Sequence, residues 1–520
     1  MGKAGVDEPV SQYDVIVIGS GIGGLTAASL LAKAGKSVLV LEAHDRPGGY
    51  AHGFKRKKYQ FDSGVHLISG CGSQGYSGGQ VIYKTLQALD ILDEIEFIDI
   101  NPFSHAHYPE LNIALPQSLN HFVNVLAEQF PAERDGLQQL TELCLQLTEE
   151  ITIADELMRE VDLESAQQLM PALFKYRKST LAEVSSQFIK DPKLLAVFAT
   201  NWPYLGLPPS KVSFIYWSTM LIGYMVDGSY YCKGGFQQLA NTLVKGLQKY
   251  AGEIRYKSPV EKIIIRNEQV VGVELNNQQI TTQQVISNAD LRQTIYEMVG
   301  EQFFPPRYLQ RVKKMQHSLS IFAVYIATDI DLTALNIGHE IFCYTDFDHE
   351  KNYARTQQGD ISWISITVPT LVEPDLAPAG QHLLMLTTLL PYELVESWKQ
   401  HKSDCMQSMI KIAAETIPDL ENHILFKEGG SPATMQRYTQ NHQGAAYGWN
   451  VTPAQVGPAR VQNKSPINGL YFAGHWTSPG GGVYGVSVSG VQAAQKVLNV
   501  RKQSDFWSLL KSQEREGVLG

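Results

Sequence analysis

The N-terminal region combines a buried strand, a glycine-rich turn, a helix and a second strand in close succession. Tyr13 to Ile18 is a β-branched run typical of a strand that is buried on both faces of a parallel sheet. Residues 19–24, Gly-Ser-Gly-Ile-Gly-Gly, match G-x-G-x-x-G, and the Ala- and Leu-rich residues 25–34 predict a helix after them. Ser37 to Leu41 predicts a second strand, with Glu42 at its end. This order predicts a Rossmann-type α/β fold that binds a dinucleotide.

The residue types in this fingerprint have separate tasks. Gly19 makes the tight turn, Gly21 lets the backbone approach a pyrophosphate, and Gly24 allows close packing of helix and strand. The helix N-terminus offers free N–H groups and the positive end of its dipole to the phosphates. Glu42 can accept hydrogen bonds from ribose hydroxyls and would repel a 2′-phosphate, which disfavours NADP. A second match to the pattern, Gly70 to Gly75, lacks the flanking strands and acid, and we interpret it as a glycine-rich loop.

A second glycine pair follows the acid and narrows the choice of dinucleotide. Residues 42–49, Glu-Ala-His-Asp-Arg-Pro-Gly-Gly, resemble the E-x-x-x-x-x-G-G continuation of FAD proteins of the glutathione-reductase-like class. Gly48 and Gly49 would let another loop approach the pyrophosphate, and Arg46 would place a positive charge near phosphate. The resemblance therefore implies FAD as cofactor.

Two later segments complete this resemblance. Gly228 to Ile263 looks like the family's middle segment, in which Val260 contacts the adenine through its backbone. Ile467 to Gly490 resembles the closing motif of phytoene desaturases and carotenoid cis-trans isomerases, whose helix, beginning near Gly482, would aim its N-terminus at the flavin. His475 stands where that family usually has Asp. A neutral imidazole can still hydrogen-bond there, so we predict a cofactor contact with an altered charge.

The segment Phe61-Asp62-Ser63-Gly64-Val65-His66 is similar to the F-D-x-G-x-H pattern of retinol saturases. The whole chain from Tyr13 to about Leu498 resembles the carotenoid isomerase and retinol saturase branch of the phytoene desaturase superfamily. That resemblance places Gly64 and Val65 close to the isoalloxazine. His66 is either the group that exchanges a proton with the substrate, and hence the catalytic candidate, or a hydrogen-bonded structural histidine.

The resemblance implies a discontinuous Rossmann FAD domain and an α+β substrate-binding domain. We expect residues 11–75, 228–297 and 423–500 in the FAD domain, 76–227 and 298–422 in the substrate-binding or cap domain, and 501–520 as a C-terminal tail. The predicted cofactor contacts are Gly19, Gly21, Gly23, Gly24, Glu42, Ala43, Arg46, Gly48, Gly49, Gly64, Val65, Val260, Gly474, His475, Gly482 and Val483.

The predicted cap contains a 15-residue apolar and aromatic run, Val212 to Val226, which is too short to span a membrane. It is either ordinary core or the wall of a tunnel for a polyene or acyl chain. The basic residues 55–58 predict either a solvated hairpin tip or a peripheral contact with an anionic membrane, and Lys175, Arg177 and Lys178 would add to such a basic patch.

Charge and cysteine content exclude other classes. A net charge of −9 disfavours nucleic acid as a partner. Five cysteines without a C-x-x-C predict neither a disulfide framework nor a metal site, and Met1 to Gln12 shows no signal-peptide core, so we expect a cytoplasmic protein. No second credible nucleotide fingerprint marks an NAD(P)H domain, and the electron partner stays open.

These features predict an FAD-dependent enzyme that isomerises or saturates carbon–carbon double bonds of a lipophilic carotenoid or retinoid. Three alternatives are a carotenoid desaturase, a flavin amine oxidase, and a non-enzymatic prenyl-binding chaperone of the GDP-dissociation-inhibitor fold. The amine oxidase would need an aromatic pair flanking the flavin, and the intact glycine motifs disfavour the chaperone.

Overall fold

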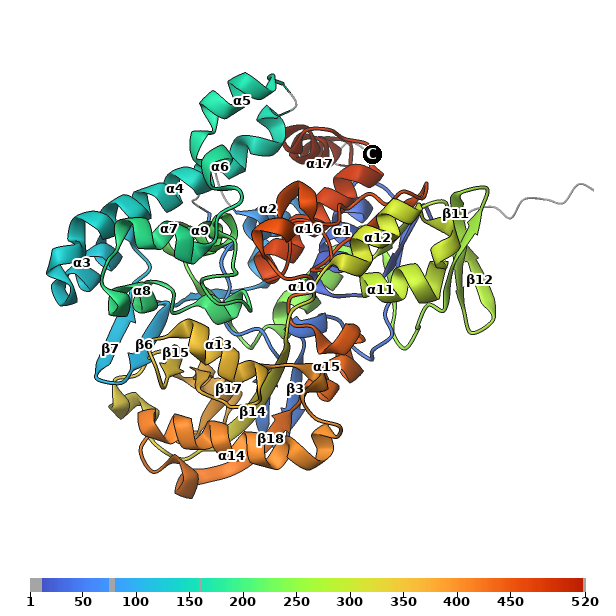
Figure 1. Cartoon of the computed structure of the whole chain (residues 1–520). Coiled ribbons are helices and arrows are strands. Elements are labelled where there is room, and N and C mark those ends of the chain that lie inside the picture. Colours follow the sequence, from blue (N-terminus) through green and yellow to red (C-terminus); the bar gives the residue numbers. More distant parts are fainter. Residues whose placement is uncertain (1–11, 74–79, 159, 518–520) are drawn as a thin grey trace, which may run out of the picture.

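The computed structural model describes residues 12–73, 80–158 and 160–517. Gly75, the predicted domain boundary there, and residues 1–11 lie outside these ranges. The predicted mixture of a Rossmann α/β unit and an α+β unit is confirmed, and the two units form the upper right and the left and lower parts of the molecule in Figure 1.

A parallel five-stranded sheet carries the glycine motif. Its strand order is β19 (Leu470–Phe472), β13 (Val285–Ser287), β1 (Val15–Ile18), β2 (Val38–Leu41) and β9 (Glu253–Arg255). Because side chains alternate along a strand, β1 splits its residues between two cores: Val15 and Val17 face one, and Ile16 and Ile18 face the other. Both faces are therefore covered, which explains the continuous apolar runs seen in the sequence.

Helices cover one face of this sheet and a β-meander covers the other. On the first face, α1 (Ile22–Lys33) packs between α10 (Gln237–Lys249) and α16 (Val483–Val497). On the second face lie β10 (Lys262–Arg266), β11 (Gln269–Leu275) and β12 (Gln278–Thr281), at the right of Figure 1. The predicted tail forms α17 (Gln503–Gly517), which packs on α1 and on α2 (Val81–Ala88) and buries Phe506 and Leu510.

The other unit is built on a mixed seven-stranded sheet. Its strand order is β18 (Ile424–Gly430), β14 (Ser320–Thr328), β17 (His382–Leu390), β16 (Trp363–Thr367), β15 (Glu340–Tyr344), β6 (Ser104–Tyr108) and β7 (Leu111–Leu115). Helix α14 (Trp398–Thr416) covers one face, at the bottom of Figure 1. The opposite face of β14 presents Ile321 to the cofactor cavity described below. The strand β18 thus joins this sheet, although the predicted division placed residues 423–500 in the cofactor domain.

Helices form the rest of this unit, at the upper left of Figure 1. They are α3 (Leu119–Gln129), α4 (Arg134–Leu157), α5 (Leu163–Leu169), α6 (Pro171–Tyr176), α7 (Leu181–Phe188), α8 (Pro192–Phe198) and α9 (Phe214–Ile222). Of the apolar run from Val212 to Val226, only Phe214–Ile222 is α-helical. Residues Gly223–Asp227 continue this helix as a π-helical turn. No helix of the described ranges has the length and hydropathy that crossing a membrane requires.

Shorter elements connect the two units. These are β3 (Gly53–Arg56) and β4 (Tyr59–Asp62), the paired strands β5 (Phe97–Asp99) and β8 (Tyr230–Cys232), and the helices α11 (Leu291–Gln293), α12 (Pro306–Lys314), α13 (His349–Gln357) and α15 (Pro432–Thr439). Strands β3 and β4 form the predicted hairpin, with Lys57 in a left-handed conformation at its turn.

Candidate cofactor and active site

A cavity runs between the two units along the C-terminal end of β1. Its volume is about 330 Å³. Every predicted cofactor contact lines it except Gly24: Gly19, Gly21, Gly23, Glu42, Ala43, Arg46, Gly48, Gly49, Gly64, Val65, Val260, Gly474, His475, Gly482 and Val483. Segments from three distant parts of the chain therefore share one elongated site.

Gly24 and Gly490 are close-packing positions. A β-carbon on Gly24 would lie 2.4 Å from the carbonyl oxygen of Gly19, so a side chain there would break the turn. A β-carbon on Gly490, in α16, would lie 2.4 Å from the carbonyl oxygen of Gly23 in α1. Because these two glycines have no side chains, α1 and α16 can pack closely against each other. The first turn of α1 therefore remains open to the cavity.

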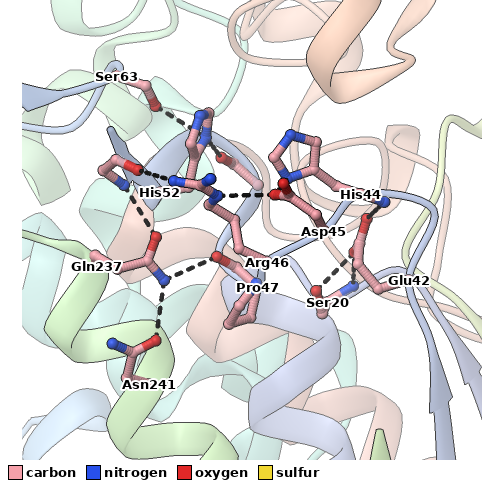
Figure 2. A network of polar contacts seen from close by, with 12 residues as sticks. Ser20, Glu42, His44, Asp45, Arg46, Pro47, His52, Ser63, Gln237 and Asn241 are labelled. Atoms are coloured by element: carbon pink, nitrogen blue, oxygen red, sulfur yellow. Dashed lines mark hydrogen bonds and ion pairs between the residues drawn. The ribbon is translucent and has the colours of Figure 1, made fainter. Parts of the chain in front are cut away.

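Glu42 forms the polar end of the cavity. Its Oε2 accepts hydrogen bonds from the backbone N–H and the hydroxyl of Ser20, both 2.6 Å, and its Oε1 accepts one from the N–H of His44 at 2.8 Å. Figure 2 shows the carboxylate held between these two residues. It is thereby fixed beside Val260, which follows Pro259 on the same cavity wall. The pair fits the ribose and adenine of a dinucleotide.

The loop with the second glycine pair is held by α10. Nε2 of Gln237 donates to the carbonyl oxygen of Pro47 at 3.0 Å, and its Oε1 accepts from the N–H of Gly53 at 3.0 Å (Figure 2). Arg46 donates to Asp45 and to the carbonyl oxygen of Gly53, so part of its charge is already neutralised. Arg46 lines the cavity and its side chain is half exposed. It can therefore face a phosphate when a ligand is bound, and its charge is balanced by Asp45 when none is.

At the other end, the N-terminus of α16 opens into the cavity. Gly482, the residue before the helix, has φ +78° and no side chain caps the first turn. The free N–H groups and the positive end of the helix dipole can therefore stabilise negative charge on a ligand. This is the arrangement that the closing motif predicted.

His475 lies beside this helix end as a neutral imidazole. Burial and the neighbouring Arg460 lower its pKa to about 3. Its Nε2 donates to the carboxamide oxygen of Asn441 at 3.1 Å, which leaves Nδ1 as an acceptor. The backbone oxygen of His475 accepts from Arg460 at 2.6 Å, so main chain and ring are both fixed.

Arg460 is a fully buried cation that no sequence pattern indicated. Its guanidinium donates to the carbonyl oxygens of Trp449, Gln455, His475 and Thr477. No carboxylate pairs with it among the residues described, and burial lowers its pKa to about 10. Its role in the structure is to hold the closing loop in place.

Several cavity residues escaped sequence reasoning. Most of them are polar or aromatic: Tyr50, His52, Asn288, Asp290, Gln293, Met298, Ile321, Gln440, Asn441 and Tyr447. The adjacent residues Arg437 and Tyr438 also line the cavity, and no local motif assigned them to the cofactor. Asn441 shows why: its carboxamide oxygen accepts from both His475 and Trp476, a contact made across more than 30 positions of chain.

His66 does not line this cavity, although its neighbour Val65 does. Its side chain points into the adjoining protein interior, where Nε2 lies 3.3 Å from Oε1 of the buried Glu340. The structure thus places His66 directly behind the cavity wall and in contact with a carboxylate. Which of the two predicted roles it has is argued below.

The residues that line the cavity fit FAD in their chemistry. It combines an acidic ribose end, a middle lined by backbone at Gly19, Gly21, Gly48 and Gly49, and a helix N-terminus at the far end. Among the described residues no cluster of His, Cys, Asp or Glu could hold a metal ion.

Comparison with known proteins agrees with this geometry. The family model described as flavin containing amine oxidoreductase matches residues 22–498. Prolycopene isomerase 1 from an Oncidium hybrid cultivar is 28% identical over 96% of this chain and 87% of its own length. All-trans-retinol 13,14-reductase from Rattus norvegicus is 27% identical over 89% of this chain and 82% of its own length.

Solved structures share the fold. An oxidoreductase from Methanosarcina mazei superposes with a TM-score of 0.62 at 19% identity, covering 93% of this chain and 99% of that one. Cyclohexylamine oxidase from Brevibacterium oxydans gives a TM-score of 0.62 at 16% identity, covering 96% and 99%.

Proposed function

Because the chain belongs to the flavin-containing amine oxidoreductase family, with FAD as its cofactor, we propose that it acts on carbon–carbon double bonds of a lipophilic polyene, a carotenoid or retinoid, by isomerisation or saturation. The observation that carries this proposal is the similarity, over nearly the whole chain, to prolycopene isomerases and retinol reductases. The cofactor contacts predicted above except Gly24, with Asn288, Asn441 and Tyr447 added, are proposed as the residues that hold FAD.

The surroundings of the flavin end support an apolar, elongated substrate. Tyr447 lines the cofactor cavity, and its hydroxyl donates to the backbone oxygen of Pro203 at 3.0 Å. The next residue, Tyr204, has its ring 5.2 Å from that of Phe342 and 5.8 Å from that of Tyr224. Aromatic side chains from four segments thus pack together next to the cofactor cavity, and such side chains favour hydrophobic ligands. We assign the seven-stranded sheet and the helices α3–α9 to substrate binding.

Bound FAD would supply hydride transfer to or from a substrate carbon. The residues of the chain would orient and desolvate the reactants: the N-terminus of α16 would stabilise negative charge, and Tyr447 and Ile321 would exclude water from the flavin end. His66, behind Val65, is the proposed proton-transfer group.

The test is anaerobic incubation of the reduced holoenzyme with cis and trans carotenoids and retinoids, followed by chromatography and mass spectrometry. An isomer of unchanged mass supports isomerisation, and a gain of two hydrogens supports saturation. Apoprotein and oxidised holoenzyme are the controls. If no polyene is converted but primary amines yield hydrogen peroxide aerobically, the proposal is wrong and amine oxidation replaces it.

Peripheral membrane contact stays a prediction. Residues 55–58 lie at a hairpin turn, but Arg56 is paired with Glu428 at 2.7 Å and Lys57 lies over the ring of Phe426. Sedimentation with anionic and with neutral vesicles would test it.

A further inference from the structure

Glu340 is a fully buried carboxylate at the first position of β15. Its Oε2 accepts a hydrogen bond from the hydroxyl of Thr367 at 2.7 Å. Its Oε1 lies 3.3 Å from Nε2 of His66 and accepts no hydrogen bond from the described part of the chain. Within that part, His66 is the only cationic partner of Glu340.

The burial of this pair determines its charge. An ionised carboxylate without a counter-charge is very costly in a protein interior. Burial also opposes protonation of His66, but the attraction of Glu340 and the weaker attraction of Asp62 outweigh it, so the pKa of His66 lies above its ordinary value. The favoured state is therefore an imidazolium paired with a carboxylate.

Other groups around His66 are neutral or add to this effect. Burial lowers the pKa of His339, and its Nε2 donates to the backbone oxygen of His66 at 2.8 Å, which fixes the main chain. The ring of Tyr204 lies 6.0 Å away, with a buried hydroxyl that has no hydrogen-bond partner among the described residues. No Lys or Arg side chain of the described ranges pairs with Glu340 or Asp62.

A second, small cavity adjoins His66 on the side of Asp62. It has a volume of about 10 Å³, and its polar lining residues are Asp62, His66, Tyr231 and Thr367. Asp62 accepts from the hydroxyl of Tyr231 at 2.6 Å and from the N–H of Phe236 at 2.7 Å, and burial raises its pKa to about 6. Nδ1 of His66 is buried without a partner in the described chain. The rest of the lining is apolar, and the space has room for about one water molecule, which would bind to the polar groups of Asp62 and His66.

We propose that Glu340 is a positioning residue that holds His66 as an imidazolium ion next to the flavin end of the cofactor cavity, with one water between His66 and Asp62 as the route by which a spent proton is replaced. The transfer of the proton to a substrate rests on the proposed function, whereas the charged state of His66 does not. Saturation of a double bond adds one hydride and one proton. In saturation, reduced FAD would supply the hydride with its electron pair, His66 would give up its N–H proton to the other carbon, and the water between His66 and Asp62 would return a proton to His66.

The charge state is tested without any substrate. FAD-loaded protein labelled with ¹⁵N-histidine is titrated between pH 5 and 9, and the signal of His66 is identified by its loss in His66→Gln. We expect a His66 midpoint above the ordinary histidine value in the native protein and a fall of about one pH unit or more in Glu340→Gln. Asp329→Asn removes a surface carboxylate that is paired with His423 at 2.8 Å and should leave the His66 midpoint unchanged. An equal His66 midpoint in the native protein and Glu340→Gln overturns the proposal.

Turnover gives the second readout. With a polyene that is converted, the fall of kcat at high pH should occur at least one pH unit lower in Glu340→Gln than in the native protein. In Glu340→Asp, which keeps a carboxylate, it should return part of the way to the native pH. A uniform loss of kcat at every pH overturns the positioning role. If Glu340→Gln does not fold, Thr367→Val takes its place. This variant removes one hydrogen bond to the Glu340 carboxylate. The loss of kcat should then move to slightly higher pH, because a less stabilised carboxylate attracts the shared proton more strongly. A normal His66 titration without conversion of any polyene refutes the proposed function alone.

Discussion

The side-chain oxygen of Asn288 lies 2.6 Å from the point that a β-carbon of Gly474 would occupy. The same carboxamide reaches the first glycine motif, since its nitrogen lies 2.8 Å from the corresponding point at Gly21. Asn288 follows β13, the strand between β1 and β19. One side chain thus lies against both glycine motifs, and a β-carbon at either glycine would force it to move.

We therefore expect Gly474→Ala to lose FAD. The new methyl group would meet Asn288, and Gly474 also has φ +91°, which alanine rarely adopts. FAD affinity should fall by at least about tenfold, which corresponds to ~1.4 kcal/mol. Titration of apoprotein into FAD, followed by flavin fluorescence, measures it. Gly457→Ala is the matched control, because Gly457 has φ +58° with no atom within 4 Å of the added carbon. Equal FAD affinities of the two variants would contradict the crowding argument.

Glu42→Ala should weaken FAD binding further. It removes the acceptor for Ser20 and His44 and, in the proposed complex, for the ribose hydroxyls. Hydrogen bonds to a charged group contribute about 1.5–3 kcal/mol each, so a loss of roughly 100-fold in affinity is expected. Glu261→Gln, a change of an exposed carboxylate outside the cavity, serves as control. Isothermal titration calorimetry with unchanged affinity for Glu42→Ala would exclude Glu42 as a ligand.

His475→Asp should lower the flavin midpoint potential. The imidazole is neutral because its pKa is lowered to about 3, so the substitution adds a negative charge beside the helix end that favours the reduced, anionic flavin. A penalty of ~1.4 kcal/mol on the reduced state corresponds to about 30 mV for a two-electron couple. Spectroelectrochemistry measures the shift, and neutral His475→Asn should change the potential much less. A potential that is equal or higher in the aspartate variant would show that residue 475 does not act through charge.

His349 should make the protein sensitive to acid. It accepts from Nε1 of Trp202 at 3.0 Å and donates to the backbone oxygen of Ala196 at 2.9 Å, and burial lowers its pKa to about 4. Because the folded state binds the proton less tightly than the unfolded state, the free energy of unfolding decreases as pH falls from about 6.5 to about 4. The decrease from this residue is up to ~3 kcal/mol.

Urea unfolding of the holoprotein at pH 7 and pH 5 measures this effect. His349→Gln should be less stable than the native protein at pH 7 but should lose less on acidification. If the free energy of unfolding of this variant falls between pH 7 and pH 5 as much as that of the native protein, the acid sensitivity comes from other histidines. Candidates are His105 and His442, whose pKa values burial also lowers to about 4.

Local pattern was enough for the elements that contact the nucleotide. The structure of residues Val15 to Glu42 could be predicted from their local sequence, because neighbouring residues specify the buried parallel strand, the glycine turn and the start of the helix. The hairpin at residues 53–62 follows in the same way from alternating residues around a basic turn. Local pattern failed at β18 and at residues 503–517, where strand pairing with β14 and docking on α1 decide the outcome.

By itself the sequence determined the dinucleotide fold, because glycines and an acid at fixed spacing act through the backbone they belong to, and its family resemblance predicted FAD and fifteen residues that line the cavity. Only the tertiary structure showed that Asn288 joins the two glycine motifs, that Arg460 holds the closing loop, and that Glu340 faces His66. These contacts join residues that are far apart in the chain. Their energies come from burial and charge in a shared interior, which no local pattern encodes.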